Sequence, residues 1–226
     1  MNQKKYILFD LDGTLTDPKE GITKSVQYAL RHYGIDVEDL DSLCPFIGPP
    51  LAESFSIFYG FPREQAVEAI SVYREYFGVQ GWRENVVYDG IEETLGALKA
   101  AGAHLLVATS KPELYAKRIL EHFHLDSYFD WIGGADMEET RVRKADVIRY
   151  VIELAGLSFD EESISQMVMV GDREHDVLGA KEVGMDCVGV LYGFGDRNEL
   201  EESGAAAIVE STSELKTRLL KLVSRG

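Results

Sequence analysis

Near the start of the chain, residues 6–15 read Tyr6-Ile7-Leu8-Phe9-Asp10-Leu11-Asp12-Gly13-Thr14-Leu15, and the other elements are organised around them. The first four residues are apolar and include aromatic and β-branched side chains, which predicts a short buried strand. Two carboxylates, Asp10 and Asp12, follow it. Acids contribute nothing to a core, but the carboxyl end of a strand is where open α/β sheets bind ligands. Because side chains at i and i+2 point the same way, both acids can face one ligand.

The composition limits what this strand can belong to. A chain of 226 residues with 45% apolar content is large enough for one core and a smaller inserted unit. The net charge of −16 argues against a nucleic acid polymer or an anionic membrane as the main partner, because either would favour a basic face. A phosphate site on such an acidic protein must be locally positive.

Cysteine usage and hydropathy indicate the compartment. Cys44 and Cys187 lie far apart in apolar surroundings, so we expect reduced thiols rather than a disulfide. The first residues lead directly into the strand without a secretory apolar segment, and no apolar run approaches about 20 residues. We expect a soluble cytoplasmic protein, either a monomer or a homodimer.

The segment after this strand has helical periodicity. Apolar residues recur at helical spacing from Ile22 to Tyr33 and stop at Gly34. Residues 45–50 are predicted to form a turn or loop, and residues 51–59 and 63–77 are predicted to be helices. Nothing between residues 18 and 82 is typical of a strand. We therefore predict an all-helical unit inserted after the first strand.

Beyond residue 84, predicted strands and helices alternate. The strands cover residues 104–108, 131–133, 167–170, 187–190 and 207–209, the last as an edge strand. The helices cover residues 91–101, 114–123, 145–154, 177–183 and 212–222. This alternation predicts an α/β fold with a doubly wound parallel sheet, covered by helices on both faces.

Polar residues gather where the predicted strands end. Thr109-Ser110 follows the predicted strand at residues 104–108, and the acidic segment 171–176 follows the predicted strand at residues 167–170. Lys144 opens the helix that precedes this latter strand. In a doubly wound sheet these ends lie along one edge, so four carboxylates would converge there with hydroxyls and a lysine. Such a group stays ionised only with a cation, because like charges repel strongly at close range. Hard oxygen ligands favour Mg²⁺, and a cation beside a lysine and a hydroxyl suits a phosphate.

Four motifs in this order resemble the haloacid dehalogenase superfamily: Asp-Leu-Asp-Gly-Thr-Leu at residues 10–15, Thr-Ser at 109–110, Lys144, and Gly-Asp-x-x-x-Asp at 171–176. The helical insert resembles that of its C1-capped phosphatases, which include phosphoglycolate phosphatases and small bacterial 5′-nucleotidases. The resemblance covers essentially the whole chain. It implies a Rossmann-like catalytic core in residues 1–16 and 84–226, and a helical cap in residues 17–83 that governs substrate choice.

The resemblance also implies a role for each motif residue. Asp10 would be the nucleophile that forms an aspartyl-phosphate, and Asp12 the general acid and then base, with a pKa raised by burial and neighbouring acids. Lys144 would neutralise charge on the nucleophile. Phosphoryl oxygens would be bound by the following groups: Thr109, Ser110 and the backbone of the Asp12-Gly13 turn. Mg²⁺ would be held by the following groups: Asp10, the Asp12 carbonyl, Asp172 and, close in or in the second shell, Asp176.

Several of these assignments have competitors. Arg141 and Arg143 are fallbacks for Lys144, because many relatives place a proline after this lysine and Ala145 stands there instead. Lys111 is expected to face solvent or the rim of the site. His122 and His124 are expected to be surface residues rather than a metal pair.

Substrate choice is expected to lie in the insert. The loop Phe46-Ile47-Gly48-Pro49-Pro50 stands where relatives place a specificity loop, and its apolar character favours a nucleoside 5′-monophosphate over phosphoglycolate. Phe46, Gly48 and Lys24 are the candidate specificity residues, with Lys24 a candidate Schiff-base lysine for phosphonate hydrolysis. The alternatives are a phosphatase of phosphoglycolate or another small phospho-acid, a phosphomutase or pyrophosphatase of the same superfamily, and, from another class, a receiver-type switch. Dehalogenase chemistry is not expected, because dehalogenases lack the second acid that Asp12 supplies.

Overall fold

The computed structural model describes residues 3–138 and 140–224, and the chain separates into two compact units. Unit 1 comprises Met1–Asp17 and Val87–Gly226, and unit 2 comprises Pro18–Val86. The sequence analysis placed these boundaries at residues 16 and 84.

The centre of unit 1 is a parallel six-stranded sheet in the order β5-β4-β1-β6-β7-β8. The strands are β1 (Tyr6–Phe9), β4 (His104–Pro112), β5 (Trp131–Ala135), β6 (Met167–Gly171), β7 (Asp186–Val190) and β8 (Ala207–Val209). The predicted α/β fold with a parallel sheet is confirmed, and β8 is an edge strand as expected. The strand predicted to end at Ala108 instead continues to Pro112.

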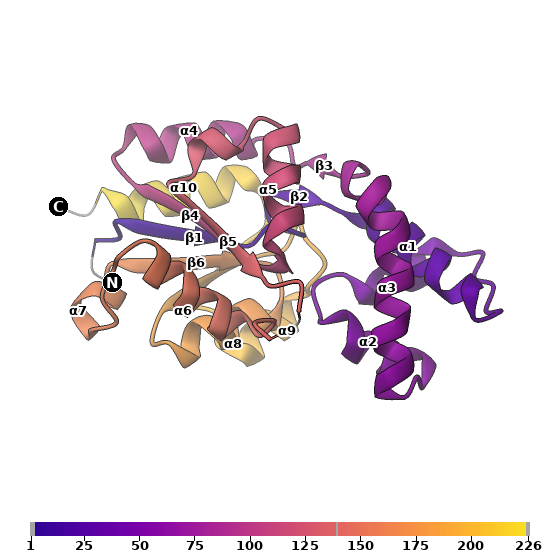
Figure 1. The fold of residues 1–226 in the computed structure, drawn as a ribbon. Helices are drawn as coiled ribbons and strands as arrows, with labels where there is room; N and C mark the ends of the chain where they lie inside the picture. The colour runs from indigo at the N-terminus through magenta and orange to yellow at the C-terminus, as the bar shows by residue number, and fades with distance from the viewer. Residues whose placement is uncertain (1–2, 139, 225–226) are drawn as a thin grey trace. The chain divides into compact units, whose positions relative to one another are not determined.

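Helices cover both faces of this sheet, with α4, α5 and α10 on one face and α6 and α8 on the other (Figure 1). The helices are α4 (Ile91–Ala100), α5 (Glu113–His122), η3 (Asp126–Tyr128), α6 (Lys144–Leu154), α7 (Glu161–Ser165), α8 (Glu174–Glu182), α9 (Arg197–Ser203) and α10 (Thr212–Val223). The sequence analysis missed α7 and α9, which are too short to show a period. Their N-cap residues, Asp160 and Asp196, could have indicated where these helices begin. Each accepts a backbone N–H from the residue three positions later.

The apolar run of β1 is buried on both faces of the sheet. Ile7, Leu8 and Phe9 have no exposed surface. Leu8 belongs to the core cluster that includes Val147 of α6 and Val177 of α8, while the Phe9 ring meets the edge of Phe129. A strand buried on both faces needs an unbroken apolar sequence, which explains why the polar residues of β1 begin only at its carboxyl end.

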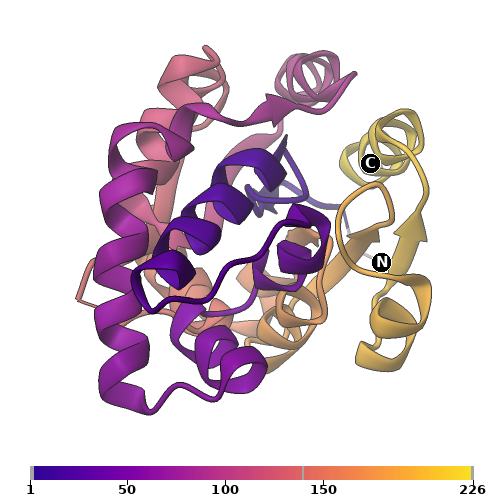
Figure 2. The same ribbon diagram turned by 90° about the vertical axis from the view of Figure 1, so that its right-hand side faces the viewer.

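Unit 2 is helical, and α1 and α3 run side by side in it (Figure 2). Its elements are α1 (Lys19–His32), η1 (Leu40–Phe46), α2 (Leu51–Tyr59), α3 (Arg63–Val79) and η2 (Gly81–Arg83). Two short strands, β2 (Thr16–Asp17) and β3 (Val86–Val87), pair where the chain leaves and re-enters unit 1. Pro45 and Phe46 were predicted to lie in a loop but belong to η1.

Two further findings concern the cysteines and the helix lengths. Cys187 is buried and Cys44 half-buried, and neither forms a disulfide. None of the helices in residues 3–138 and 140–224 combines the length and apolar character needed to cross a membrane.

Candidate active site

The carboxyl ends of the three central strands bring the predicted site residues to one edge of the sheet. In the register, Phe9 of β1 lies opposite Val107 of β4 and Val170 of β6. Asp10 continues this pairing, because its N–H donates to the Val170 carbonyl at 2.9 Å. The residues that follow in each strand therefore lie at the same edge, which is the expected ligand edge of a parallel sheet.

Lys144 joins two carboxylates of this site. It is the first residue of α6, and its Nζ lies 2.9 Å from Asp10 Oδ1 and 2.7 Å from Asp176 Oδ1. The ammonium also donates to the Ala108 carbonyl at 3.1 Å, and the side chain is only 3% exposed. Burial alone would lower the pKa of Lys144, but Asp10 and Asp176 outweigh it and raise that pKa. The two carboxylates therefore favour the ammonium form of Lys144 beside the candidate nucleophile.

The two fallback residues for this role lie elsewhere. Arg143 is exposed and pairs with Glu182 at 2.7 Å. Arg141 donates through Nε to the Gly134 carbonyl and lies over the Tyr150 ring, 3.6 Å from its centroid. Among the three basic candidates, Lys144 alone contacts Asp10 within the described residues.

Three buried acids form a group with the geometry of a metal site. Oxygens of Asp10, Asp172 and Asp176 lie within 4.8 Å of one another. Burial, and next the charges of Asp176 and Asp10, raise the pKa of Asp172 well above its usual range. Three carboxylates and the Lys144 ammonium sum to −3 + 1 = −2, which a divalent cation would neutralise. An all-oxygen ligand set suits Mg²⁺, so the residues present fit this ion.

Two glycines allow these acids to approach the backbone. A Cβ on Gly13 would lie 2.1 Å from Asp172 Oδ2, and a Cβ on Gly171 would lie 2.1 Å from Asp176 Cγ. Gly13 also has a φ of +79°, which side chains rarely adopt. The Gly13 N–H was expected to bind phosphate, but it donates to the Thr16 carbonyl at 2.8 Å. Gly13 therefore makes room for Asp172 rather than offering its own amide.

Asp12 pairs with a lysine that the sequence analysis placed incorrectly. Lys111 Nζ lies 2.6 Å from Asp12 Oδ2, and its side chain is 4% exposed, so it is neither solvent-facing nor a rim residue. Burial raises the pKa of Asp12, Lys111 opposes this effect, and Asp10 adds to it. The direction agrees with the raised pKa expected for a general acid. The strand β4 continues through Lys111, whereas the predicted strand ended at Ala108, so nothing in the sequence pattern placed Lys111 at the site.

The two hydroxyl residues predicted to bind phosphate, Thr109 and Ser110, differ in burial. The Thr109 side chain is buried, and its Oγ1 accepts the Lys111 N–H at 3.2 Å, which leaves the hydroxyl proton available to donate. Ser110, the next residue of the strand, is half-buried.

The loop after β7, residues 191–195, is a part of the site that the sequence analysis did not single out. The Phe194 N–H donates to Asp172 Oδ2 at 2.8 Å, and the Tyr192 hydroxyl donates to the Thr14 carbonyl at 3.0 Å. A Cβ on Gly195 would lie 1.9 Å from the Asp172 carbonyl oxygen. The Gly-x-Gly pattern of residues 193–195, directly after a buried strand, could have indicated this part of the site, because glycines allow the backbone to approach other groups closely.

The candidate specificity residues lie in unit 2. Phe46 is 2% exposed and packs against the rings of Phe55 and Phe58, so it belongs to the core of the insert. Gly48 has a φ of +104°, a conformation that requires glycine. Hydrogen bonds to Glu20 and Glu84 raise the pKa of Lys24, whereas a Schiff-base lysine needs a lowered pKa.

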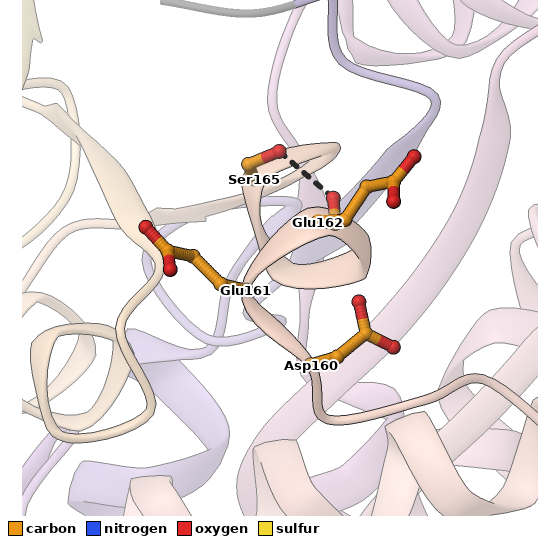
Figure 3. A pocket seen from close by; sticks show the side chains of 4 residues that line it. All are labelled: Asp160, Glu161, Glu162 and Ser165. Atoms are coloured by element: carbon orange, nitrogen blue, oxygen red, sulfur yellow. Dashed lines mark hydrogen bonds between the residues drawn. The ribbon is translucent and has the colours of Figure 1, made fainter.

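Two other clusters are unrelated to this site. His122 and His124 are exposed, as expected, and belong to no metal-ligand group in the described part of the chain. A pocket at α7 is lined by Asp160, Glu161, Glu162 and Ser165 (Figure 3). Its carboxylates point in different directions, and α7 precedes β6, so the pocket lies at the opposite end of that strand from Asp172.

Replacing Lys144 with methionine should destabilise the protein strongly. The change leaves Asp10 and Asp176 buried without their cation, which costs about 3–5 kcal/mol. Urea unfolding at pH 7.5 in EDTA would measure the loss. Arg143→Met is the matched control, and it should change stability by less than about 1 kcal/mol because its ion pair is exposed. Equal effects of the two substitutions would contradict this account of Lys144.

Comparisons with known proteins agree with this geometry. A family model described as haloacid dehalogenase-like hydrolase matches residues 7–190. A 5′-nucleotidase from Pseudomonas aeruginosa is 50% identical over 194 residues, which are 86% of this chain and 86% of that protein. The tyrosine-protein kinase PtkA of Mycobacterium tuberculosis is 38% identical over 210 residues, which are 92% of this chain and 69% of the kinase.

A solved structure is similar over nearly the whole chain. The crystal structure of a predicted phosphatase from Clostridium acetobutylicum superposes with a TM-score of 0.92 at 50% identity. The match covers 98% of this chain and 100% of that one.

Proposed function

This chain belongs to the haloacid dehalogenase-like hydrolases and is a phosphatase of that family, and we propose that it hydrolyses nucleoside 5′-monophosphates through a phosphorylated Asp10. The observation that carries the proposal is the buried Asp10 carboxylate, paired with Lys144 and grouped with Asp172 and Asp176. The substrate class is supported by the 50% identical relative named 5′-nucleotidase.

In the proposed mechanism, each residue acts at a defined atom. An Asp10 carboxylate oxygen attacks phosphorus, and Asp12 donates a proton to the leaving oxygen. Asp12 then accepts a proton from the water that hydrolyses the aspartyl-phosphate. The Thr109 hydroxyl donates to a phosphoryl oxygen, and Lys144 offsets the charge of the nucleophile. Two steps suit phosphomonoesters, whose uncatalysed hydrolysis is extremely slow.

A magnesium ion would complete this electrostatic arrangement. Asp10, Asp172 and Asp176 would hold it, with the Asp12 carbonyl as a further ligand. When bound, the ion would offset the repulsion between the anionic nucleophile and the anionic phosphate.

The comparisons exclude one of the alternative functions and leave the others open. Because the family match covers residues 7–190, a receiver-type switch is no longer an alternative. Phosphoglycolate phosphatase, phosphomutase and pyrophosphatase share the same motifs. The experiment is a panel of nucleoside monophosphates, phosphoglycolate, sugar phosphates and pyrophosphate, assayed with Mg²⁺ and with EDTA. Nucleoside monophosphates should give the highest kcat/KM, and preference for another member would overturn the substrate assignment.

We also propose that unit 2 selects the substrate. Introducing a negative charge into the loop after η1 tests this proposal. Gly48 is unsuitable because its φ of +104° would strain any side chain, whereas Pro49 is half-buried. Pro49→Asp should lower kcat/KM for phospho-acids at least about tenfold more than for nucleoside monophosphates, because only the former carry a second anion. Ser71→Asp, which adds the same charge on an exposed position of α3, is the control. Unchanged ratios in both variants would argue against this role.

A further inference from the structure

We propose that Lys111 is a positioning residue that holds Asp12 by Oδ2, so that Oδ1 alone exchanges the proton. This inference rests on the proposed function and adds a residue to it. The family resemblance gives roles to Thr109 and Ser110 but none to Lys111.

The two oxygens of Asp12 have different surroundings. Oδ2 lies 2.6 Å from Lys111 Nζ, with the side chains 4% and 11% exposed. Oδ1 is buried and has no hydrogen-bond partner in residues 3–138 and 140–224. A carboxylate held at one oxygen presents the other in a fixed direction, as a proton-transferring group requires.

The backbone around Lys111 is built to place it there. The pairing of β4 with β5 shifts between Thr109 and Pro112, and such irregularities re-aim side chains. The Lys111 N–H is anchored on Thr109 Oγ1 at 3.2 Å. Gly134 of β5 leaves space for this segment, because a Cβ there would lie 2.5 Å from the Lys111 carbonyl oxygen.

The other lysine of the site cannot replace Lys111. The Lys144 ammonium already has three oxygens within reach, on Asp10, Asp176 and the Ala108 carbonyl. An ammonium carries three hydrogens, so this set uses all of them. The two acids after β1 therefore have separate cations, with Lys144 at Asp10 and Lys111 at Asp12.

The two half-reactions exchange one proton through Asp12 Oδ1. In the first half, the Asp10–phosphorus bond forms, the bond to the leaving oxygen breaks, and that oxygen takes the proton from Asp12 Oδ1. In the second half, a water molecule gives a proton to Asp12 Oδ1. The oxygen of this water bonds to phosphorus as the Asp10–phosphorus bond breaks. Lys111 takes no part in either proton transfer.

Leaving groups of different basicity separate positioning from a structural role. The leaving oxygen of an alkyl phosphate needs a proton, whereas p-nitrophenolate departs without one. With an alkyl phosphomonoester that the wild type hydrolyses, Lys111→Met should lower kcat/KM about 100-fold, against less than about threefold with p-nitrophenyl phosphate. Since kcat/KM ends at the first irreversible step, slow hydrolysis of phospho-Asp10 does not enter it. Lys111→Arg should recover part of the loss.

The controls make each outcome decisive. Lys117→Met removes an exposed lysine of α5 that pairs with Glu113, and it should leave both substrates unaffected. Equal losses on both substrates would assign Lys111 a structural role. Weaker inhibition by inorganic phosphate would assign it to phosphate binding. No loss on either substrate would show that Lys111 has no role in the reaction. Each of these results overturns the proposal. Failure of the proposed function itself would appear separately, as a wild type that hydrolyses neither substrate.

Discussion

Asp10→Asn should reduce phosphomonoester turnover by at least about 10³-fold while leaving the fold intact. Asparagine is nearly isosteric with aspartate, but its amide oxygen is a poor nucleophile, so the covalent step is lost. The amide can still accept a hydrogen bond from Lys144, which lies 2.9 Å from the present carboxylate. Because the substitution also removes one negative charge from an acid-rich group, the unfolding free energy should change by no more than about 1 kcal/mol.

Phosphate release and urea unfolding measure these two effects. Asp89→Asn provides the control, because Asp89 is exposed and belongs to the same unit as the site. Turnover of even a few per cent of the wild-type rate in purified Asp10→Asn would remove Asp10 from the role of nucleophile. Loss of activity together with unfolding would be uninformative about chemistry, so the unfolding curve is measured on the same preparation.

Asp172→Asn should abolish Mg²⁺-dependent activity and yet stabilise the metal-free protein. Asp172 is fully buried beside Asp10 and Asp176, and the Phe194 N–H that it accepts does not offset their repulsion. Removing one of these mutually repelling buried charges should raise the unfolding free energy by about 2 kcal/mol in EDTA. Adding Mg²⁺ should stabilise the wild type more than the variant, because the variant lacks one charged ligand.

The pH dependence gives the same prediction a second readout. The pKa values of Asp12, Asp172 and Asp176 are raised by burial first, so the folded state holds protons that the unfolded state releases above about pH 4. Stability in EDTA should therefore fall as the pH rises above about 5, and Asp172→Asn should reduce this slope. Exposed acids with lowered pKa values make stability rise with pH instead, but only below about pH 5. These acids are Glu93, Asp160 and Glu182. A variant less stable than the wild type at pH 7.5 would contradict the picture of an overcharged buried group.

The sequence was most informative where one residue type has few structural uses. Acids at the end of a buried strand have no packing role, which is why Asp10 and Asp172 could be assigned to a site before any geometry was known. The apolar β1 likewise predicted a strand buried on both faces, and the structure confirms this. The four motifs predicted the family, and the comparisons confirm it.

The errors arose where tertiary contacts decide the outcome. Lys111 follows a Thr-Ser pair and precedes a proline, a pattern typical of a strand end, yet β4 continues through it with an irregular pairing. Local sequence could not show that Lys111 meets Asp12, which lies 99 positions away. Phe46 similarly looked available to a substrate, but the rings of Phe55 and Phe58 cover it in the insert.

The claim that Asp10 carries the phosphoryl group can be tested by trapping it. Asp12→Asn removes the base that hydrolyses the aspartyl-phosphate, while p-nitrophenyl phosphate needs no acid to lose its leaving group. Acid-quenched Asp12→Asn protein, digested and analysed by mass spectrometry after mixing with this substrate, should carry one phosphoryl group on the peptide containing Asp10, with a burst of one p-nitrophenolate per site. A phosphoryl group on any other residue, or continued turnover without a label on Asp10, would contradict the mechanism.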